Sequence, residues 1–105
     1  MKRRITSYSV DMVDDPEWPE ASIWSVSVAW RGPDSWGVYN GSRALSRSGT
    51  WDYEPLPSSR EDDWLTEHRF TREEALRRAE MAAPDIVWNG YTAHAAYDHW
   101  KAGPA

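Results

Sequence analysis

The side chains best suited to catalysis stand in one stretch of this 105-residue chain, GTWDYEPLPSSREDDWLTEHRF, residues 49–70. Ser58 or Ser59 with His68 would supply a nucleophile and a base, but such a pair is defined by geometry and nothing in this spacing requires it. The chain also contains no Gly-x-Ser-x-Gly, P-loop or Gly-x-Gly-x-x-Gly motif. The sequence therefore predicts helix-capping serines, a surface histidine, no catalytic residue and a protein that is not an enzyme.

The same stretch holds three consecutive acids, Glu61, Asp62 and Asp63, which resemble a carboxylate cluster. Acids that follow Ser58 and Ser59 would stand at the positive end of a short helix, where negative charge is favourable. An acid/base or metal-binding role would need a partner histidine and a pocket, and the sequence identifies neither. We therefore interpret these acids as a helix-start feature.

The remaining histidines give little support for a metal site. His94 and His99 are five residues apart, which turns them about 140° from one another around a helix, so they would not face one ion. His94 and Asp98 are four residues apart, but a zinc site needs further ligands. The absence of cysteine excludes disulfides and thiolate ligands. We expect neither a metal nor a cofactor.

Tryptophan is the most unusual feature of the composition, with eight residues beside five tyrosines. Indoles fill cores, but they also stack on ligands and dominate binding hot spots. Trp24 and Trp30 stand on an alternating strand face, which predicts core. Tryptophans beside the acidic segments, at 18, 51 and 64, fit a core and an exposed binding surface equally well. The candidate binding surface comprises Trp51, Tyr53, Arg60, Glu61, Asp62, Asp63 and Trp64.

Length and charge limit the class of protein. The length fits a single domain, residues 1–105. The net charge of −5 argues against direct nucleic-acid binding, which needs a basic face. The basic start MKRRITSYSVDM has no apolar run behind it and does not resemble a signal peptide. No stretch approaches the roughly 18 apolar residues of a membrane span, so we expect a cytoplasmic protein without membrane contacts.

The first half of the chain alternates between polar and apolar residues, as half-buried antiparallel strands do. Strands are predicted at residues 7–13, 23–31, 36–39, 42–45 and 50–54. Asn40-Gly41 predicts a two-residue hairpin turn, in which Trp36 lies opposite Leu45. Together these segments predict an antiparallel meander.

The second half favours helices. Thr71 and Glu74 form a capping box, with Glu73–Arg77 and Glu74–Arg78 as i,i+4 pairs, and Pro84 ends the helix. Residues 85–88 are predicted as a buried strand and residues 92–103 as a second helix. The predicted fold class is α+β: a mostly antiparallel meander sheet with one main helix, about 72–83, and a shorter C-terminal helix packed on one face. Between sheet and helix, residues 54–69 are expected to form an ordered irregular connection, with Trp51, Tyr53 and Trp64 partly buried beneath it.

Residues 49–93 also carry a recognisable pattern. A Gly-x-Trp-x-x-Glu-Pro-x-Pro-Ser-Ser-Arg segment begins at Gly49, Arg69-Phe70 and an alanine-rich helix follow, and Asn89-Gly90 closes it. The pattern resembles small proteins common in actinobacteria and their bacteriophages. The resemblance covers under half of the chain, and it implies no activity and no functional residue.

These observations favour a small non-enzymatic binding protein, phage or phage-derived, that docks onto a host protein. Exposed acids at residues 61–63 would steer a basic partner, and a nearby indole would anchor it. Two alternatives remain at this stage: an acidic mimic of DNA that inhibits a nucleic-acid-binding protein, and a small ligand-binding domain that uses aromatic stacking.

Overall fold

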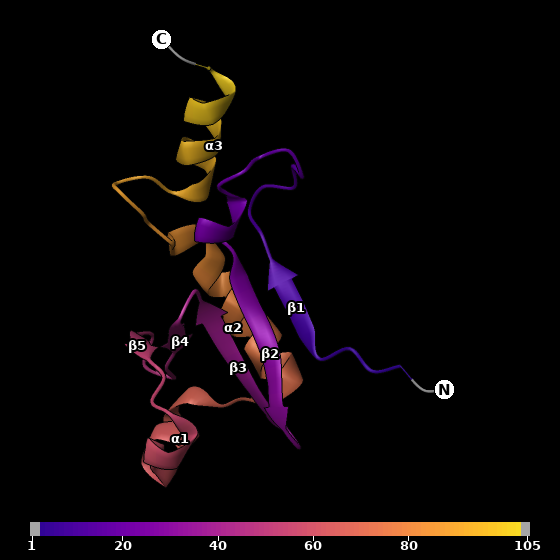
Figure 1. The fold of residues 1–105 in the computed structure, drawn as a ribbon, viewed down its shortest axis with the longest axis vertical. Coiled ribbons are helices and arrows are strands. Elements are labelled where there is room, and N and C mark those ends of the chain that lie inside the picture. The colour runs from indigo at the N-terminus through magenta and orange to yellow at the C-terminus, as the bar shows by residue number, and fades with distance from the viewer. Residues whose placement is uncertain (1–2, 104–105) are drawn as a thin grey trace.

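The computed structural model describes residues 3–103, and its centre is a five-stranded antiparallel sheet (Figure 1). Each strand pairs with the next along the chain, so the sheet order is β1-β2-β3-β4-β5. The predicted meander and α+β class are confirmed. The strands are β1 (Ser7–Val10), β2 (Val26–Gly32), β3 (Ser35–Asn40), β4 (Arg43–Leu45) and β5 (Trp51–Tyr53).

The alternation predicted for β2 is present in its first three residues, whereas Trp30, also predicted as core, is only partly buried. Val26 and Val28 are fully buried, whereas Ser27 is exposed. Val28 pairs with Val38 of β3, so apolar side chains of neighbouring strands share the core face. Trp24 is buried as predicted, although it precedes the strand and follows a 3-10 turn at Ala21–Ile23.

The β3–β4 hairpin is correct, but its predicted turn is displaced by one residue. Asn40 pairs with Arg43, so the two central residues are Gly41 and Ser42, with φ of +60° at Gly41. The side-chain amide of Asn40 donates to the carbonyl oxygens of Ile23 and Ser25, at 3.0 and 3.1 Å. These two bonds hold Asn40 in the strand pair and move the turn to the following residue.

Trp36 consequently has a different neighbour from the one predicted. The residue expected opposite it was Leu45, but Trp36 instead forms an isolated bridge with Phe70. The two backbone hydrogen bonds of this bridge measure 2.8 and 2.9 Å. The chain segment before the main helix is thereby attached to the start of β3.

Helix α2 (Arg72–Ala82) is the predicted main helix and lies against the sheet (Figure 1). The Thr71 hydroxyl accepts from the backbone N–H of Glu74 at 3.3 Å, which confirms the cap. Small side chains let the helix approach the sheet closely: Ala75 and Ala79 on its inner face are buried, as is Ala83 just after its last residue. The Glu74–Arg78 pair is confirmed at 2.8 Å.

The predicted pairing of Glu73 with Arg77 is wrong. Arg77 instead joins the same carboxylate as Arg78, that of Glu74, three residues before it, and Glu73 pairs with Arg72. A 3-10 turn at residues 83–85 then ends the helical region beside Pro84.

Helix α3 (Ala93–Lys101) is the predicted C-terminal helix, and it extends past the end of the sheet (Figure 1). Tyr97 meets the buried Trp18 edge-on at 5.4 Å, and its hydroxyl donates to Asp15 at 2.7 Å. Trp18 stacks in turn on Trp24, with ring centroids 5.2 Å apart. Of the tryptophans that the sequence left open, Trp18 therefore belongs to the core.

The buried strand predicted at residues 85–88 is wrong. Ile86 is buried, but Val87 is exposed and Trp88 is 48% exposed. Trp88 forms an isolated bridge with Tyr91, across a two-residue turn in which Asn89 and Gly90 both have positive φ. A run of three apolar residues is too short to separate a buried strand from other structure. None of the helices within residues 3–103 combines the length and apolar character needed to cross a membrane.

Candidate functional site

The connection between β5 and α2 contains a helix of its own, α1 (Asp62–His68), after a 3-10 turn at residues 57–59. The predicted serine caps are wrong. Arg60 has an extended backbone between the two helical turns, so Glu61 takes the N-cap position of α1, without a side-chain cap. Asp62 and Asp63 do stand in the first turn of α1, where their charge suits the helix dipole.

Glu54 organises the irregular part of this connection. Its carboxylate, 15% exposed, accepts hydrogen bonds from the Tyr39 hydroxyl at 2.8 Å, from Arg60 at 3.1 Å and from Arg69. Burial alone would raise the pKa of Glu54, but the hydrogen bonds from Arg69 and Tyr39 outweigh burial and hold that pKa below its usual value. Glu54 is therefore ionised at neutral pH and joins strand β3 to the two ends of the connection.

Further bonds fix the two arginines around Glu54. Nε of Arg60 donates to the carbonyl oxygen of Pro55 at 3.0 Å, and Nη1 of Arg69 donates to that of His68 at 3.1 Å. Burial, with the neighbouring Glu54 carboxylate, raises the pKa of Tyr39, so its hydroxyl remains a donor. The connection is thus held by side-chain bonds where it lacks a strand partner.

His68 is buried, which contradicts the predicted surface histidine. Nδ1 lies 2.7 Å from the carbonyl oxygen of Trp64, and Nε2 lies 2.8 Å from Oδ2 of Asp52. Both ring nitrogens are occupied, so neither the Ser58 nor the Ser59 hydroxyl is paired with the imidazole, and both serines are exposed. The hydrogen bond from His68 lowers the pKa of Asp52. No nucleophile–base pair is assembled here.

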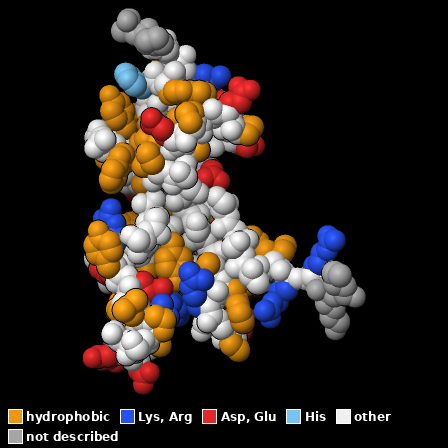
Figure 2. All heavy atoms as spheres, in the orientation of Figure 1, with side chains coloured by type: hydrophobic (Ala, Val, Ile, Leu, Met, Phe, Trp, Pro, Cys, Tyr) orange, Lys and Arg blue, Asp and Glu red, His pale blue; other side chains and the backbone are white. Residues whose placement is uncertain are grey.

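The predicted surface residues divide into two groups. Trp51 and Trp64 are half-buried, and Trp64 stacks on His68 with ring centroids 4.0 Å apart. Tyr53 is 74% exposed, so the expectation that it would be partly buried is wrong. The three acids at 61–63 are exposed. Figure 2 shows acidic side chains at the lower tip of the molecule, where Figure 1 places α1.

Beside this tip the structure forms a cleft of about 590 Å³ that the sequence did not predict. We call it the arginine cleft, because Arg31, Arg47, Arg60 and Arg69 line it, with Asp34 and Thr66 among the other lining residues. Of the four arginines, only Arg60 belonged to the predicted surface. The others come from β2, from the β4–β5 turn and from the end of α1, and no regular spacing relates them.

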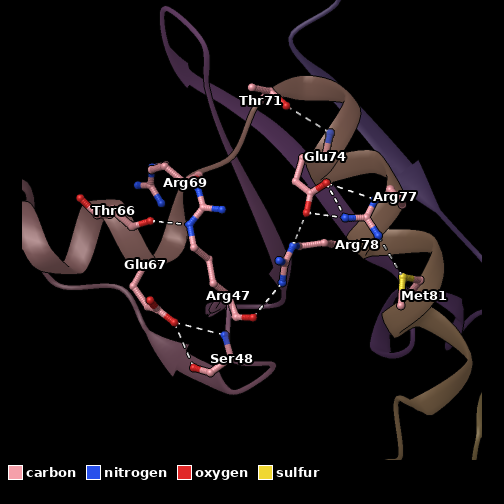
Figure 3. Close-up of polar contacts among 10 residues, drawn as sticks. All are labelled: Arg47, Ser48, Thr66, Glu67, Arg69, Thr71, Glu74, Arg77, Arg78 and Met81. Carbon is pink, nitrogen blue, oxygen red and sulfur yellow. Dashed lines mark hydrogen bonds and ion pairs between the residues drawn. The ribbon is translucent and has the colours of Figure 1, made fainter.

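Arg47 of the arginine cleft contacts several neighbouring segments, and Figure 3 shows its bonds with Thr66, Arg69 and Arg78. Its guanidinium donates to the carbonyl oxygens of Thr66 at 2.8 Å and Arg69 at 2.6 Å, and it lies over the ring of Phe70 at 4.7 Å. Arg78 of α2 donates to the carbonyl oxygen of Arg47 at 2.9 Å. These contacts connect the β4–β5 turn to both α1 and α2.

A second concavity, of about 400 Å³, lies between α3 and the 3-10 turn at residues 21–23. Its walls are largely aromatic and include Trp24, Trp88, Tyr91 and Trp100. Nε1 of Trp24 donates to the carbonyl oxygen of Tyr91 at 3.0 Å and fixes one wall. Across the part of the chain that the structure describes, no three His, Asp or Glu side chains are placed to hold a metal ion.

Comparison with known proteins adds no relative: no protein-family model, curated protein or solved structure matches the chain. The function must therefore be inferred from the surface and its chemistry.

Proposed function

We propose that this chain is a small non-enzymatic binding protein, of phage or phage-derived origin, that acts in the cytoplasm by docking onto a host protein. The docking face consists of Tyr53, Leu56, Glu61, Asp62 and Asp63. The observation that carries the proposal is that Tyr53 and Leu56 are 74% and 73% exposed on a segment held in place by partly buried polar bonds.

Exposed apolar patches with polar residues around them are typical of interaction sites. Here the Glu54 carboxylate and the Arg60 guanidinium already fix the backbone between Tyr53 and the acids. A partner would therefore lose little conformational entropy on this side of the interface when it binds. Tyrosine is also among the residues enriched at binding hot spots.

The charge of the docking face indicates the kind of partner. Its three exposed acids would attract a basic surface and increase the association rate, while Tyr53 and Leu56 would bury apolar area. An acidic mimic of DNA would need carboxylates in extended rows. The acids of this face instead form one tip, with an arginine-lined cleft beside it. This arrangement favours protein docking over mimicry.

The test is site-specific photocrosslinking in a host lysate, with a crosslinking amino acid at position 53 and, as the matched control, at position 91. Tyr91 is another exposed tyrosine, two residues before α3, which lies at the opposite end of the molecule from α1 (Figure 1). We expect a basic host protein to crosslink from position 53 and not from position 91. The triple variant Glu61→Ala, Asp62→Ala, Asp63→Ala should associate more slowly with that purified protein, and salt should affect it less.

Two results would contradict the proposal. One is equal crosslinking from both positions. The other is a purified partner that a folded triple variant and a folded Tyr53→Ala, Leu56→Ala variant retain as well as the unaltered chain does.

A further inference from the structure

The arginine cleft concentrates positive charge in a protein whose net charge is −5. Four guanidinium groups line it, and the carboxylates that offset them are Asp34 in the lining and Glu54 behind Arg60 and Arg69. Among the lining residues and their ion-pair partners, four positive charges against two negative ones leave an excess of two, and the acids at 61–63 lie outside the lining, on the neighbouring tip. Charge of one sign in a concave site raises the local concentration of ions of the opposite sign.

The four guanidinium groups retain donors for a ligand. Within residues 3–103, Arg31 uses two N–H groups, toward the Tyr39 hydroxyl and the Trp30 carbonyl oxygen. Each of the other three likewise donates to two acceptor atoms of the protein: Arg47, Arg60 and Arg69. A guanidinium has five N–H donors, so about three remain on each group.

The existing bonds also hold the guanidinium groups in position. Arg47 is bonded to the backbone of residues 66 and 69, and Arg69 lies over the Trp64 ring at 5.3 Å. Side chains that are fixed before a ligand arrives lose less rotamer freedom when they bind it. The cleft is therefore organised to receive an anion rather than assembled around one.

From this geometry we propose that the arginine cleft binds the phosphate group of a phosphate monoester. A phosphate monoester carries about −1.5 to −2 charges at neutral pH and presents three acceptor oxygens, which match the excess charge and the number of free donors better than a single carboxylate does. Guanidinium forks bind phosphate oxygens in pairs. The volume of about 590 Å³ exceeds that of one phosphate group, so the esterified part would lie against Pro57 and Leu65.

The ester can come from a small molecule or from a phosphorylated side chain of a protein, and the shared chemistry is the phosphate group. The inference does not depend on the docking face, because it concerns the isolated chain and a different set of side chains. A missing host partner would leave phosphate binding intact, and absent phosphate binding would leave docking intact.

The experiment is titration of the purified chain with inorganic phosphate at pH 7.5 and constant ionic strength, followed by NMR of the arginine Nε–Hε resonances. We expect saturable binding that shifts resonances of the cleft arginines. Arg31 is exposed, so Arg31→Gln should fold normally and weaken phosphate binding about tenfold, which corresponds to about 1.4 kcal/mol. Arg31→Lys keeps the charge but loses the fork of N–H donors. Its affinity for phosphate should lie between that of the unaltered chain and that of Arg31→Gln.

The matched control is Arg43→Gln, which removes the same charge from an exposed arginine of β4 that does not line the arginine cleft. It should leave the affinity for phosphate unchanged within about twofold, because at constant ionic strength distant surface charges are largely screened. Acetate should bind more weakly than phosphate. Equal losses in the two glutamine variants, equal affinity for acetate, or no saturable binding by the folded chain would overturn the proposal.

Two further ligands identify the source of the phosphate. A phosphoserine peptide that binds more tightly than inorganic phosphate, while its unphosphorylated form does not bind, indicates a phosphorylated partner. A sugar phosphate that binds more tightly than both indicates a small molecule. Either result supports the phosphate site, whereas equal binding of the unphosphorylated peptide counts against it.

Discussion

The imidazole of His68 and the carboxylate of Asp52 meet at 2.8 Å and join helix α1 to strand β5. The other ring nitrogen of His68 lies 2.7 Å from the carbonyl oxygen of Trp64. Carboxylate and carbonyl oxygens only accept hydrogen bonds, so the imidazole supplies the N–H in either contact. This contact anchors the helix whose first turn carries the exposed acids.

The first prediction concerns His68. His68→Phe keeps an aromatic ring to stack on Trp64 but removes both hydrogen bonds of a buried side chain. We expect it to lower the free energy of unfolding by about 1–3 kcal/mol, the usual cost of such a loss. Chemical denaturation measures this change in the free energy of unfolding. His94→Phe, at an exposed histidine of α3, should change stability by less than about 0.5 kcal/mol, and equal effects would show that the His68 bonds contribute nothing.

The second prediction concerns pH. Because the folded pKa of Glu54 lies below its usual value, its contribution to stability is fully present above the unfolded pKa and is lost as the pH falls through the folded one. The difference in unfolding free energy between the unaltered chain and Glu54→Gln should be largest at neutral pH and shrink below about pH 4–5. Denaturant titrations at several pH values measure this difference. Glu80→Gln, at an exposed glutamate of α2, controls for the lost charge, and a Glu54→Gln gap that stays constant with pH would refute the assignment.

The third prediction compares two tryptophans. Trp24 is buried against Trp18, whereas Trp88 is 48% exposed on its turn. Trp24→Ala should cost roughly 3–5 kcal/mol of stability, because it leaves a cavity in the core and removes the hydrogen bond from the indole to the Tyr91 carbonyl oxygen. Trp88→Ala should cost less than about 1 kcal/mol, since about half of the residue is already exposed to solvent and its truncation leaves no enclosed cavity. Denaturation midpoints of similar value in the two variants would place the core elsewhere.

The fourth prediction tests the displaced hairpin turn. Gly41→Val places a β-branched side chain at φ +60° and should cost about 1–3 kcal/mol. Asn40→Ala should also destabilise, by about 1–2 kcal/mol, because it removes the two bonds to the backbone of residues 23 and 25. Ser42→Ala is the near-neutral control. Thermal and chemical denaturation give the order of stability of the three variants. If Asn40→Ala is as stable as the unaltered chain, the Asn40 amide does not set the hairpin register.

Local patterns were enough to predict much of the fold. The alternation of apolar and polar residues at 26–28 indicates directly which side chains are buried. The Thr71 cap depends only on residues within one helix turn, and the alanines mark the buried face of α2 by their spacing. Features that depend on distant partners were not predictable in this way. The hairpin register depends on an Asn40 amide that reaches the backbone of residues 23 and 25.

The candidate site shows the same limit more strongly. Arg60 and the acids were identified because they stand together in the sequence, as do Tyr53 and Trp64. The arginines of the cleft come from β2, the β4–β5 turn and the end of α1. The spacing of charged residues along the chain does not predict that these arginines lie together. His68 likewise finds its carboxylate partner 16 residues away, so its burial had no local signal.

The pairing of every strand with its neighbour in sequence has a consequence for folding kinetics. The β2–β3, β3–β4 and β4–β5 hairpins close short loops, so little chain entropy is lost before their first ladder bonds form, whereas residues 11–25 separate β1 from β2. Sheet formation should therefore be rapid for a β-rich chain, as it is for proteins dominated by contacts between nearby residues. The bridge between Trp36 and Phe70 closes a much longer loop. We expect mutations at that bridge mainly to accelerate unfolding, and mutations in the β2–β3 hairpin mainly to slow folding.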